Sequence, residues 1–218
     1  MCKGLLNIVA RRTGFTIGSI LITGATRRTA TLVTSGLCIT QGDNIFKLST
    51  SRIYDNVSAV KWVKSTVVRK KLPNAIIIKI IERVPIAVLQ HDHISSLIDE
   101  NGELIEATGG NQINLPVVLG EEANIKAPAI IMMISKFEAL RGKVEVIKFV
   151  RKRRWDIVVS GLTVKLPEQD IEHAIEILAK IVLQNNINKD TASYIDLRVH
   201  GSVIVRDPKL HRKNGVSV

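Results

Sequence analysis

The sequence predicts an α+β protein with two domains, a small first domain and a larger second domain that is mainly antiparallel β-sheet with a few helices. Two observations support this fold class. Residues 15–85 show the order strand, helix, helix, strand, strand, whereas the later residues show short strand segments between turn signals. The chain has 218 residues, of which 45% are hydrophobic, so it can form one large core or two small ones.

The first domain opens with a predicted strand and a predicted helix. Residues 15–24 are mostly apolar and β-branched and end at Gly24, which is typical of a strand. Thr26 or Thr29 can cap a helix that continues to about Ser35, because a threonine hydroxyl accepts a bond from a free N–H at a helix start.

A second predicted helix follows the turn between Gly36 and Gly42. Ser49 or Thr50 provides its cap, and the apolar residues Ile53, Val57 and Val60 recur at spacings of four and three. This spacing places them on one face of a helix. The helix therefore has one apolar side, which must pack against another part of the protein.

A predicted hairpin closes the first domain. Two strand segments, around Val67-Val68 and at residues 76–81, flank the turn Leu72-Pro73-Asn74, and Pro85 ends the second one because proline cannot donate to a strand ladder. A sheet of three strands is too small to stand alone. We expect both helices to cover the same face of it.

The second domain begins as a predicted antiparallel meander and continues with alternating strands and helices. The turn around residues 99–102 separates two of the meander strands. The predicted strands are residues 86–90, 95–99, 103–105, 115–120, 144–150, 155–160, 163–166, 194–199 and 202–206, and the predicted helices are residues 127–140 and 168–185. Three acidic residues, Glu168, Asp170 and Glu172, stand where a helix start favours negative charge.

The net positive charge of the chain comes entirely from its first part. Residues 1–85 contain 14 Lys and Arg against 3 Asp and Glu, whereas residues 86–218 contain 17 of each. Such a distribution indicates an anionic contact for the first domain, which leaves open nucleic acid, lipid headgroups, an acidic partner or a solvated basic surface.

No pattern for catalysis, cofactor binding or metal binding is found in the sequence. Phosphate-loop and dinucleotide fingerprints and a nucleophile elbow are all missing. His91 and His93 would share one side of a strand, but no further ligand is near them, and Cys2 and Cys38 are too far apart in sequence for a metal site. We therefore predict a protein that is not an enzyme, without a metal or cofactor.

The basic run at residues 151–155 has two interpretations. Basic side chains beside Trp155 are suited to binding phosphate and stacking on a base. We favour a solvated hairpin turn, because only 4% of the chain is aromatic and single-strand binders need several stacking side chains.

The final predicted strand, residues 202–206, is a candidate edge strand. An edge strand has unpaired N–H and C=O groups, to which a partner strand can add. The opposing interpretation is an edge kept free of partners by charges such as Arg206 and Asp207. The sequence leaves both open.

Several short motifs in a fixed order resemble the bacterial cell-division FtsQ family, called DivIB in other bacteria. They are Gly14-Phe15, Gly24, Gly42-Asp43-Asn44-Ile45-Phe46, Trp62-Val63, Val68-Arg69, Leu72-Pro73, Glu82-Arg83, Pro85, Ala87, Asp99, Gly102, Leu115-Pro116, Gly120, Arg153-Arg154-Trp155-Asp156, Val164-Lys165-Leu166-Pro167 and Ile195-Asp196-Leu197-Arg198. Each motif is weak alone, but together they extend over residues 14–206.

The resemblance implies a domain organisation. Residues 15–85 would form a POTRA domain and residues 86–206 an FtsQ-type β-domain, followed by a mobile tail at residues 207–218. The family carries a cytoplasmic tail and one transmembrane helix before its POTRA domain, and no run of 18 apolar residues occurs here. We therefore expect residues 1–14 to be an N-terminal segment from which the anchor is missing.

The resemblance also implies a function. The family is a non-enzymatic scaffold on the periplasmic side of the inner membrane, where it links early and late division proteins and holds the small partners FtsB and FtsL. Strand addition at the C-terminal edge would bind the partner through Tyr194, Asp196, Arg198, Val199, Ser202, Val203, Ile204, Val205 and Arg206. We expect the basic first domain to face anionic lipid, and we expect no nucleic-acid partner. A nucleic-acid-binding protein that uses its basic first domain is the alternative.

Overall fold

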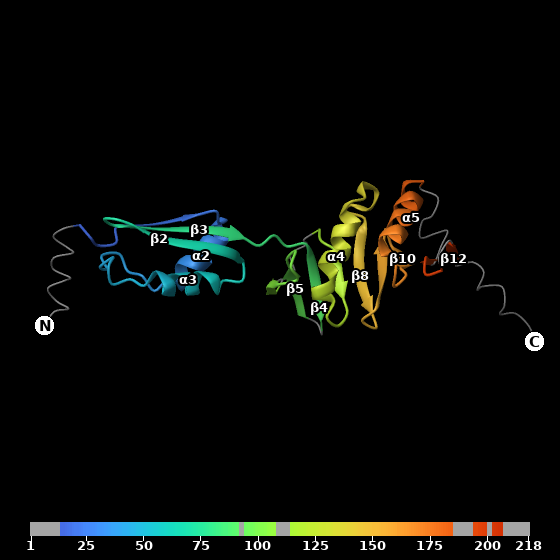
Figure 1. Ribbon diagram of the computed structural model, residues 1–218, viewed down its shortest axis with the longest axis horizontal. Coiled ribbons are helices and arrows are strands. Elements are labelled where there is room, and N and C mark those ends of the chain that lie inside the picture. The colour runs from blue at the N-terminus through green and yellow to red at the C-terminus, as the bar shows by residue number, and fades with distance from the viewer. Residues whose placement is uncertain (1–13, 92–93, 108–113, 185–193, 200–201, 207–218) are drawn as a thin grey trace, which may run out of the picture. The chain divides into compact units, whose positions relative to one another are not determined.

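The computed structural model describes residues 14–91, 94–107, 114–184, 194–199 and 202–206 (Figure 1). The chain divides into two compact units, Met1–Arg83 and Val84–Val218. The N-terminal segment before residue 14 and the tail expected at residues 207–218 lie outside the described residues.

The first unit has the predicted order of strand, helix, helix, strand, strand. Its elements are β1 (Ser19–Thr23), α2 (Arg27–Gly36), α3 (Thr50–Ser58), β2 (Val63–Lys71) and β3 (Ala75–Glu82). The strands form one sheet in the order β1-β3-β2, with β1 parallel and β2 antiparallel to β3. Strand β1 is shorter than predicted, because Thr16 forms an isolated bridge to Asn44 instead of joining this sheet.

Both helices of the first unit start at a hydroxyl cap that the sequence offers. The Thr26 Oγ1 accepts from the Thr29 N–H at 3.4 Å, and the Ser49 side chain accepts from the Arg52 N–H at 3.3 Å. Of the two caps considered for each helix, Thr26 and Ser49 therefore act as the N-caps.

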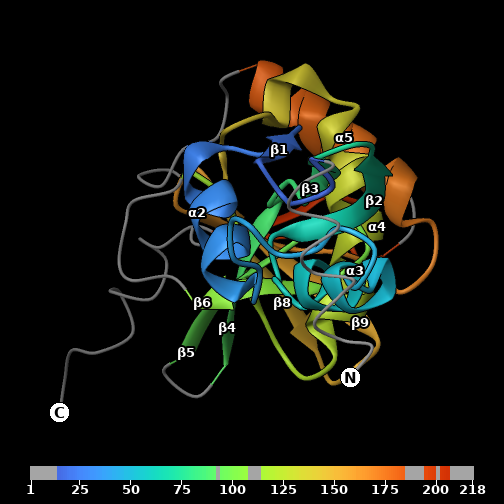
Figure 2. The same cartoon turned by 90° about the vertical axis from the view of Figure 1, so that its left-hand side faces the viewer.

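The core of the first unit lies between its sheet and its two helices. Figures 1 and 2 show α2 and α3 on one side of the sheet. Alternate β3 residues, Ile76, Ile78 and Ile80, are at most 4% exposed and pack with Ile53 and Val57 of α3. Among residues 14–83, which the structure describes, no helix covers the opposite face of the sheet.

The second unit is built on a nine-stranded sheet in the order β12-β11-β10-β9-β8-β7-β4-β5-β6. Its strands are β4 (Ala87–His91), β5 (Ile94–Ile98), β6 (Leu104–Ala107), β7 (Val117–Leu119), β8 (Val144–Val150), β9 (Arg154–Val159), β10 (Leu162–Lys165), β11 (Tyr194–Asp196) and β12 (Ile204–Arg206), and its helices are α4 (Ala123–Ser135), η1 (Glu138–Leu140) and α5 (Ile171–Leu183).

The predicted α+β class with a mainly antiparallel second domain is confirmed, although three pairs of described strands in the second sheet are parallel. The predicted meander is present as β4-β5-β6, and β8 and β9 form the predicted hairpin. Strand β7 is parallel to β4 and β8, and β10 is parallel to β11. Helix α4 connects β7 to β8, and α5 connects β10 to β11, since parallel neighbours need a long crossover.

Both predicted helices in this unit have wrong boundaries. The helix predicted at residues 127–140 begins at Ala123 and ends at Ser135, and the three residues of η1 form a separate turn. Helix α5 begins at Ile171, so Glu168 and Asp170 precede it and only Glu172 lies in its first turn. In both cases the residue before the helix, Glu122 or Asp170, has a left-handed backbone and makes no capping bond, so the usual start signal is absent.

The core of the second unit forms where the inner face of the sheet meets α4 and α5. One row of paired residues, Ile147, Ile157, Val164 and Ile195, crosses four strands and is at most 1% exposed. Ala174, Ile175 and Leu178 of α5 belong to the same cluster. The buried side chain of Ile195, the central residue of β11, therefore anchors this strand in the core.

Candidate functional site at the sheet edge

The candidate site lies at the end of the second sheet, where β12 is the last strand in the described residues. Strand β11 lies between β10 and β12, and among the strands that the structure describes β12 is hydrogen-bonded to β11 alone. The antiparallel register pairs Tyr194 with Arg206, Ile195 with Val205, and Asp196 with Ile204. The other side of β12 leaves backbone N–H and C=O groups for a further strand.

Three consecutive apolar residues at this edge are exposed to solvent. Val203 is 44% exposed, Ile204 is 47% exposed and Val205 is 42% exposed. Val199, in the bend after β11, is 52% exposed. An apolar strand with an open edge is the kind of surface that other chains bind by strand addition.

The structure brings the predicted residues together, but within shorter strands than the sequence predicts. Strand β11 ends at Asp196, so Arg198 and Val199 follow it, and strand β12 begins at Ile204, so Ser202 and Val203 precede it. Strand β11 ends early because β10 ends at Lys165. The Leu197 N–H donates to the Lys165 carbonyl, and β10 has no later residue with which Arg198 or Val199 could pair.

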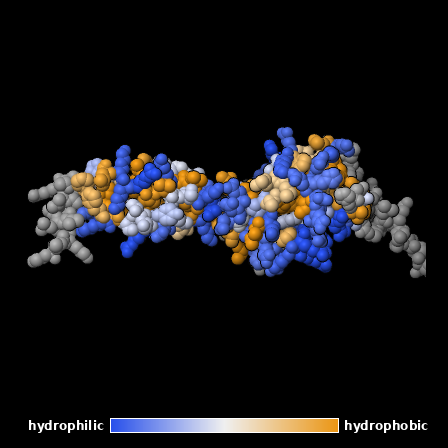
Figure 3. Space-filling model, in the orientation of Figure 1, coloured by the Kyte–Doolittle hydropathy of each residue, from blue (hydrophilic) through white to orange (hydrophobic). Residues whose placement is uncertain are grey.

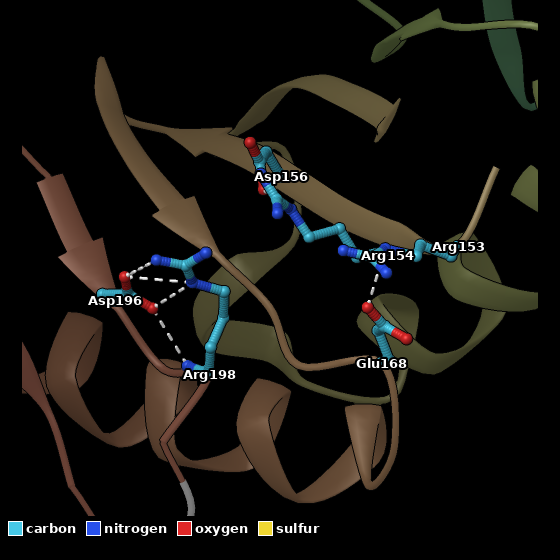
Figure 4. A network of polar contacts seen from close by, with 6 residues as sticks. All are labelled: Arg153, Arg154, Asp156, Glu168, Asp196 and Arg198. Atoms are coloured by element: carbon cyan, nitrogen blue, oxygen red, sulfur yellow. Dashed lines mark hydrogen bonds and ion pairs between the residues drawn. The ribbon is translucent and has the colours of Figure 1, made fainter. Parts of the chain in front are cut away.

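A buried carboxylate fixes the end of β11. The Asp196 side chain is 8% exposed, and the Arg198 guanidinium donates to it from Nε at 2.8 Å to Oδ1 and from Nη2 at 2.6 Å to Oδ2 (Figure 4). The Arg198 backbone N–H also donates to Oδ1 at 3.1 Å. The bidentate contact between Arg198 and Asp196 therefore fixes the conformation of the chain directly after the strand.

The same contact determines the ionisation of both side chains. The hydrogen bonds from Arg198 hold the pKa of Asp196 below its ordinary value of 3.8, although burial acts in the opposite direction. Asp196 in turn raises the pKa of Arg198. Both groups are therefore charged at neutral pH, and the pair acts as a positioning contact for the edge.

Further charged residues on neighbouring strands extend this polar network, and sequence reasoning did not identify them as part of it. Asp156 of β9 pairs in register with Lys165 of β10, which pairs with Asp196 of β11. Arg154 lies 3.5 Å from Asp156, measured from Nε to Oδ1 (Figure 4). Lys165 also lies 4.3 Å above the Tyr194 ring, measured from Nζ to the ring centroid. Alternating charges across neighbouring strands attract one another and hold the strand order.

The basic run at residues 151–155 forms a hairpin turn followed by the start of β9. Residues 151–153 form the turn between β8 and β9, with left-handed backbone at Arg151 and Lys152. Lys152 pairs with Glu121 and Glu122, and Arg153 pairs with Glu168 (Figure 4). Ion pairs of this kind are typical of a hairpin turn on the protein surface.

A hollow of about 490 Å³ lies next to the edge. Asp170, directly before α5, and His173 of α5 line one side of it, and the segment after β11 lines the other, through Leu197, Arg198 and Val199.

The described residues contain no group of three or more His, Cys, Asp and Glu side chains placed to hold a metal ion. His91 is the last residue of β4, and His93 lies outside the described residues. Among the helices described, none is both long enough and apolar enough to cross a membrane.

Comparison with known protein families gives a match to each of the two units. Residues 15–83 match the family description "POTRA domain, FtsQ-type", and residues 87–198 match "Cell division protein FtsQ/DivIB, C-terminal". The second match ends before β12, so the outermost strand lies beyond the matched range.

Similar whole proteins carry the same description. The chain is 32% identical over 191 residues to "Cell division protein FtsQ" of Rickettsia prowazekii, with 87% of this chain and 72% of that protein covered. It is 24% identical over 202 residues to "Cell division protein FtsQ" of Bradyrhizobium diazoefficiens, with 92% of this chain and 59% of that protein covered.

One solved structure is also similar. It is the major extracytoplasmic domain of the bacterial cell division protein DivIB from Geobacillus stearothermophilus, which is 18% identical, covers 49% of this chain and 98% of its own, and superposes with a TM-score of 0.36.

The fold and the family matches define a bacterial cell-division protein with a POTRA domain followed by a β-domain. The chain belongs to the FtsQ/DivIB family.

Proposed function

We propose that this chain is a non-enzymatic scaffold of the division machinery, which binds small FtsB- and FtsL-type proteins by strand addition at β12 and so links early and late division proteins. The observation that carries the proposal is the open side of β12, with Val203, Ile204 and Val205 exposed beside it. The nine residues proposed to bind the partner are Tyr194, Asp196, Arg198, Val199, Ser202, Val203, Ile204, Val205 and Arg206.

Five of the nine proposed residues fall into two groups by their contacts. Ile204, Val205 and Arg206 would supply the backbone ladder, because they form the outermost described strand. Asp196 and Arg198 would act by holding the chain at the end of β11 in place. An edge strand that is already ordered favours binding, because less conformational entropy is lost when the partner binds.

The proposal includes a cellular position. We propose that residues 15–85 and 86–206 are the two functional domains, that both lie on the periplasmic side of the inner membrane, and that the first faces anionic lipid. Family membership supports the division role, and the 14 Lys and Arg among residues 1–85 support the lipid contact.

A proline substitution tests the strand-addition mechanism. The membrane-external segment of the FtsB-type protein from the same organism is titrated against the chain, and binding is measured by calorimetry. Val203→Pro removes a backbone donor directly before β12 and is expected to weaken binding at least tenfold.

The matched control uses the other end of the same sheet. Leu104→Pro places proline at the first residue of β6, which is also an outer strand of the described sheet and is 43% exposed at this position. This variant is expected to bind like the unchanged chain. Equal binding by the Val203 variant and the unchanged chain would contradict the mechanism.

A further inference from the structure

The face of the first sheet that lies opposite its helices combines cationic and apolar side chains. Side chains alternate along a strand, so the residues between the buried isoleucines of β3 point to the other side. The register places Arg69 of β2, Ile77 of β3 and Leu21 of β1 in one row across that face, and Val67 and Lys79 in the next row. We call these residues, with Lys71 and Ile81, the open sheet face.

Three of the four apolar members of the open sheet face are exposed and the fourth, Ile77, is half-buried, whereas the isoleucines on the other side are buried. Leu21 is 53% exposed, Val67 is 46% exposed and Ile81 is 62% exposed. An exposed patch of apolar side chains is more often an interaction site than a surface that faces only solvent.

The charges on the open sheet face all have one sign. Arg69, Lys71 and Lys79 are exposed there, and no Asp or Glu occupies an outward position on the three strands. Glu82, at the end of β3, is occupied elsewhere, because it accepts from the Thr26 backbone N–H at 2.6 Å and from the Thr26 hydroxyl at 3.0 Å at the start of α2. The face is therefore complementary to an anionic surface.

The arrangement fits a bilayer surface better than a peptide. Apolar side chains from three strands and cations from two strands cover a face, whereas a bound peptide would contact a single line of residues. At a bilayer, Leu21, Val67 and Ile81 can enter the boundary between headgroups and acyl chains, while the long cationic side chains reach the phosphates.

We propose that the open sheet face is the surface by which the first unit lies on a bilayer that contains anionic lipid. The inference deepens the lipid contact included in the proposed function and rests on it. It assigns the contact to one side of the sheet and leaves the helix side free for other proteins.

Vesicle binding by charge-matched variants tests the assignment. The full chain is sedimented with vesicles of phosphatidylcholine alone and with vesicles that contain 30% phosphatidylglycerol, a composition on the order of cellular anionic content. The face variant is Arg69→Gln, Lys71→Gln and Lys79→Gln. The control variant is Arg27→Gln, Arg52→Gln and Lys61→Gln, which changes the net charge equally on exposed positions outside the sheet.

The face variant is expected to bind anionic vesicles about 100-fold more weakly, since each cation near such a surface contributes about fivefold. The control variant is expected to lose much less, and Leu21→Ser with Ile81→Ser to weaken the binding that remains at high salt. Equal losses in the two charge variants, or equal binding to both vesicle types by the unchanged chain, would overturn the assignment.

Circular dichroism verifies that each variant is folded, which is expected because all substituted positions are exposed. The FtsB-type segment is titrated in parallel. If the face variant binds that segment normally but no longer binds lipid, the lipid face and the strand-addition site are separate. If the unchanged chain does not bind anionic vesicles but still binds the FtsB-type segment, the present inference is wrong and the scaffold proposal is unaffected.

Discussion

At the scale of single residues, the contact between Asp196 and Arg198 is the most specific feature of the candidate site. A carboxylate that is 8% exposed needs partners, and the guanidinium with the backbone N–H of the same residue supplies three donors. Removing either side chain leaves the other without its main partner. The pair therefore determines the path by which the chain leaves β11.

The pair predicts a pH dependence of stability. Because the folded pKa of Asp196 lies below the ordinary value of 3.8, the pair stabilises the fold at pH values above 3.8 and loses this effect as the pH falls through the lowered folded pKa. Carboxyl NMR should show Asp196 titrating below 3.8. In the Arg198→Gln variant the titration should move upward.

The same pair predicts a coupling in the free energy of unfolding. We expect a double-mutant cycle of Asp196→Asn and Arg198→Gln to give about 1–2 kcal/mol, reduced from the value for a buried pair because the Arg198 side chain is 42% exposed. Urea unfolding at pH 7 provides the measurement. Strictly additive effects of the two substitutions would show that the contact contributes nothing.

At the scale of helices and strands, the end of β1 is determined by a single glycine. Gly24 has a φ of 79°, and a Cβ atom at this position would collide with the Ile80 carbonyl oxygen of β3. The parallel strands β1 and β3 can therefore separate at this point only with glycine.

Alanine at this position is expected to destabilise the first unit. Gly24→Ala should lower the free energy of unfolding by at least about 1–2 kcal/mol, from the left-handed backbone and the collision together. Gly36→Ala, in α2, is the control, since a Cβ there would meet no atom within 4 Å other than those of the neighbouring residues and the backbone of its own helix. Urea unfolding followed by tryptophan fluorescence makes the comparison, and equal stability of the two variants would refute the argument.

Local signals allowed most helices and strands to be predicted from the sequence. Thr26 and Ser49 are hydroxyl caps followed by amphipathic runs, and both helices begin there. Helix α4 was placed four residues late because Glu122 starts it without a capping side chain, so its start depends on tertiary packing of the buried Ala123. The hairpin neighbours could be predicted from the sequence, but the parallel neighbours could not, since pairing across α4 and α5 is not local.

The candidate site could be predicted only where its residues are close in sequence. Residues 194–206 form one short segment, so their proximity needed no knowledge of the fold. Lys165 and Asp156 join that segment only because β10 and β9 lie beside β11. The binding role of the nine proposed residues stays a prediction.

At the scale of the whole molecule, the two units present different kinds of surface. The first unit combines a basic, partly apolar sheet face with a separate helix layer, and the second unit combines a neutral composition with an open apolar edge. FtsQ/DivIB family membership assigns the chain to cell division. We therefore expect membrane contact and partner capture to be separable by mutation.

A partner strand that adds to β12 would protect the backbone amides of this strand, and amide hydrogen exchange detects such protection directly. When the FtsB-type segment is bound, we expect slower exchange of backbone amides at residues 203–206, on the edge of the sheet, and unchanged exchange along Leu104–Ala107 at the other edge. Unchanged exchange at residues 203–206 with saturating partner, or protection located only in the first unit, would show that the partner does not bind by strand addition at β12.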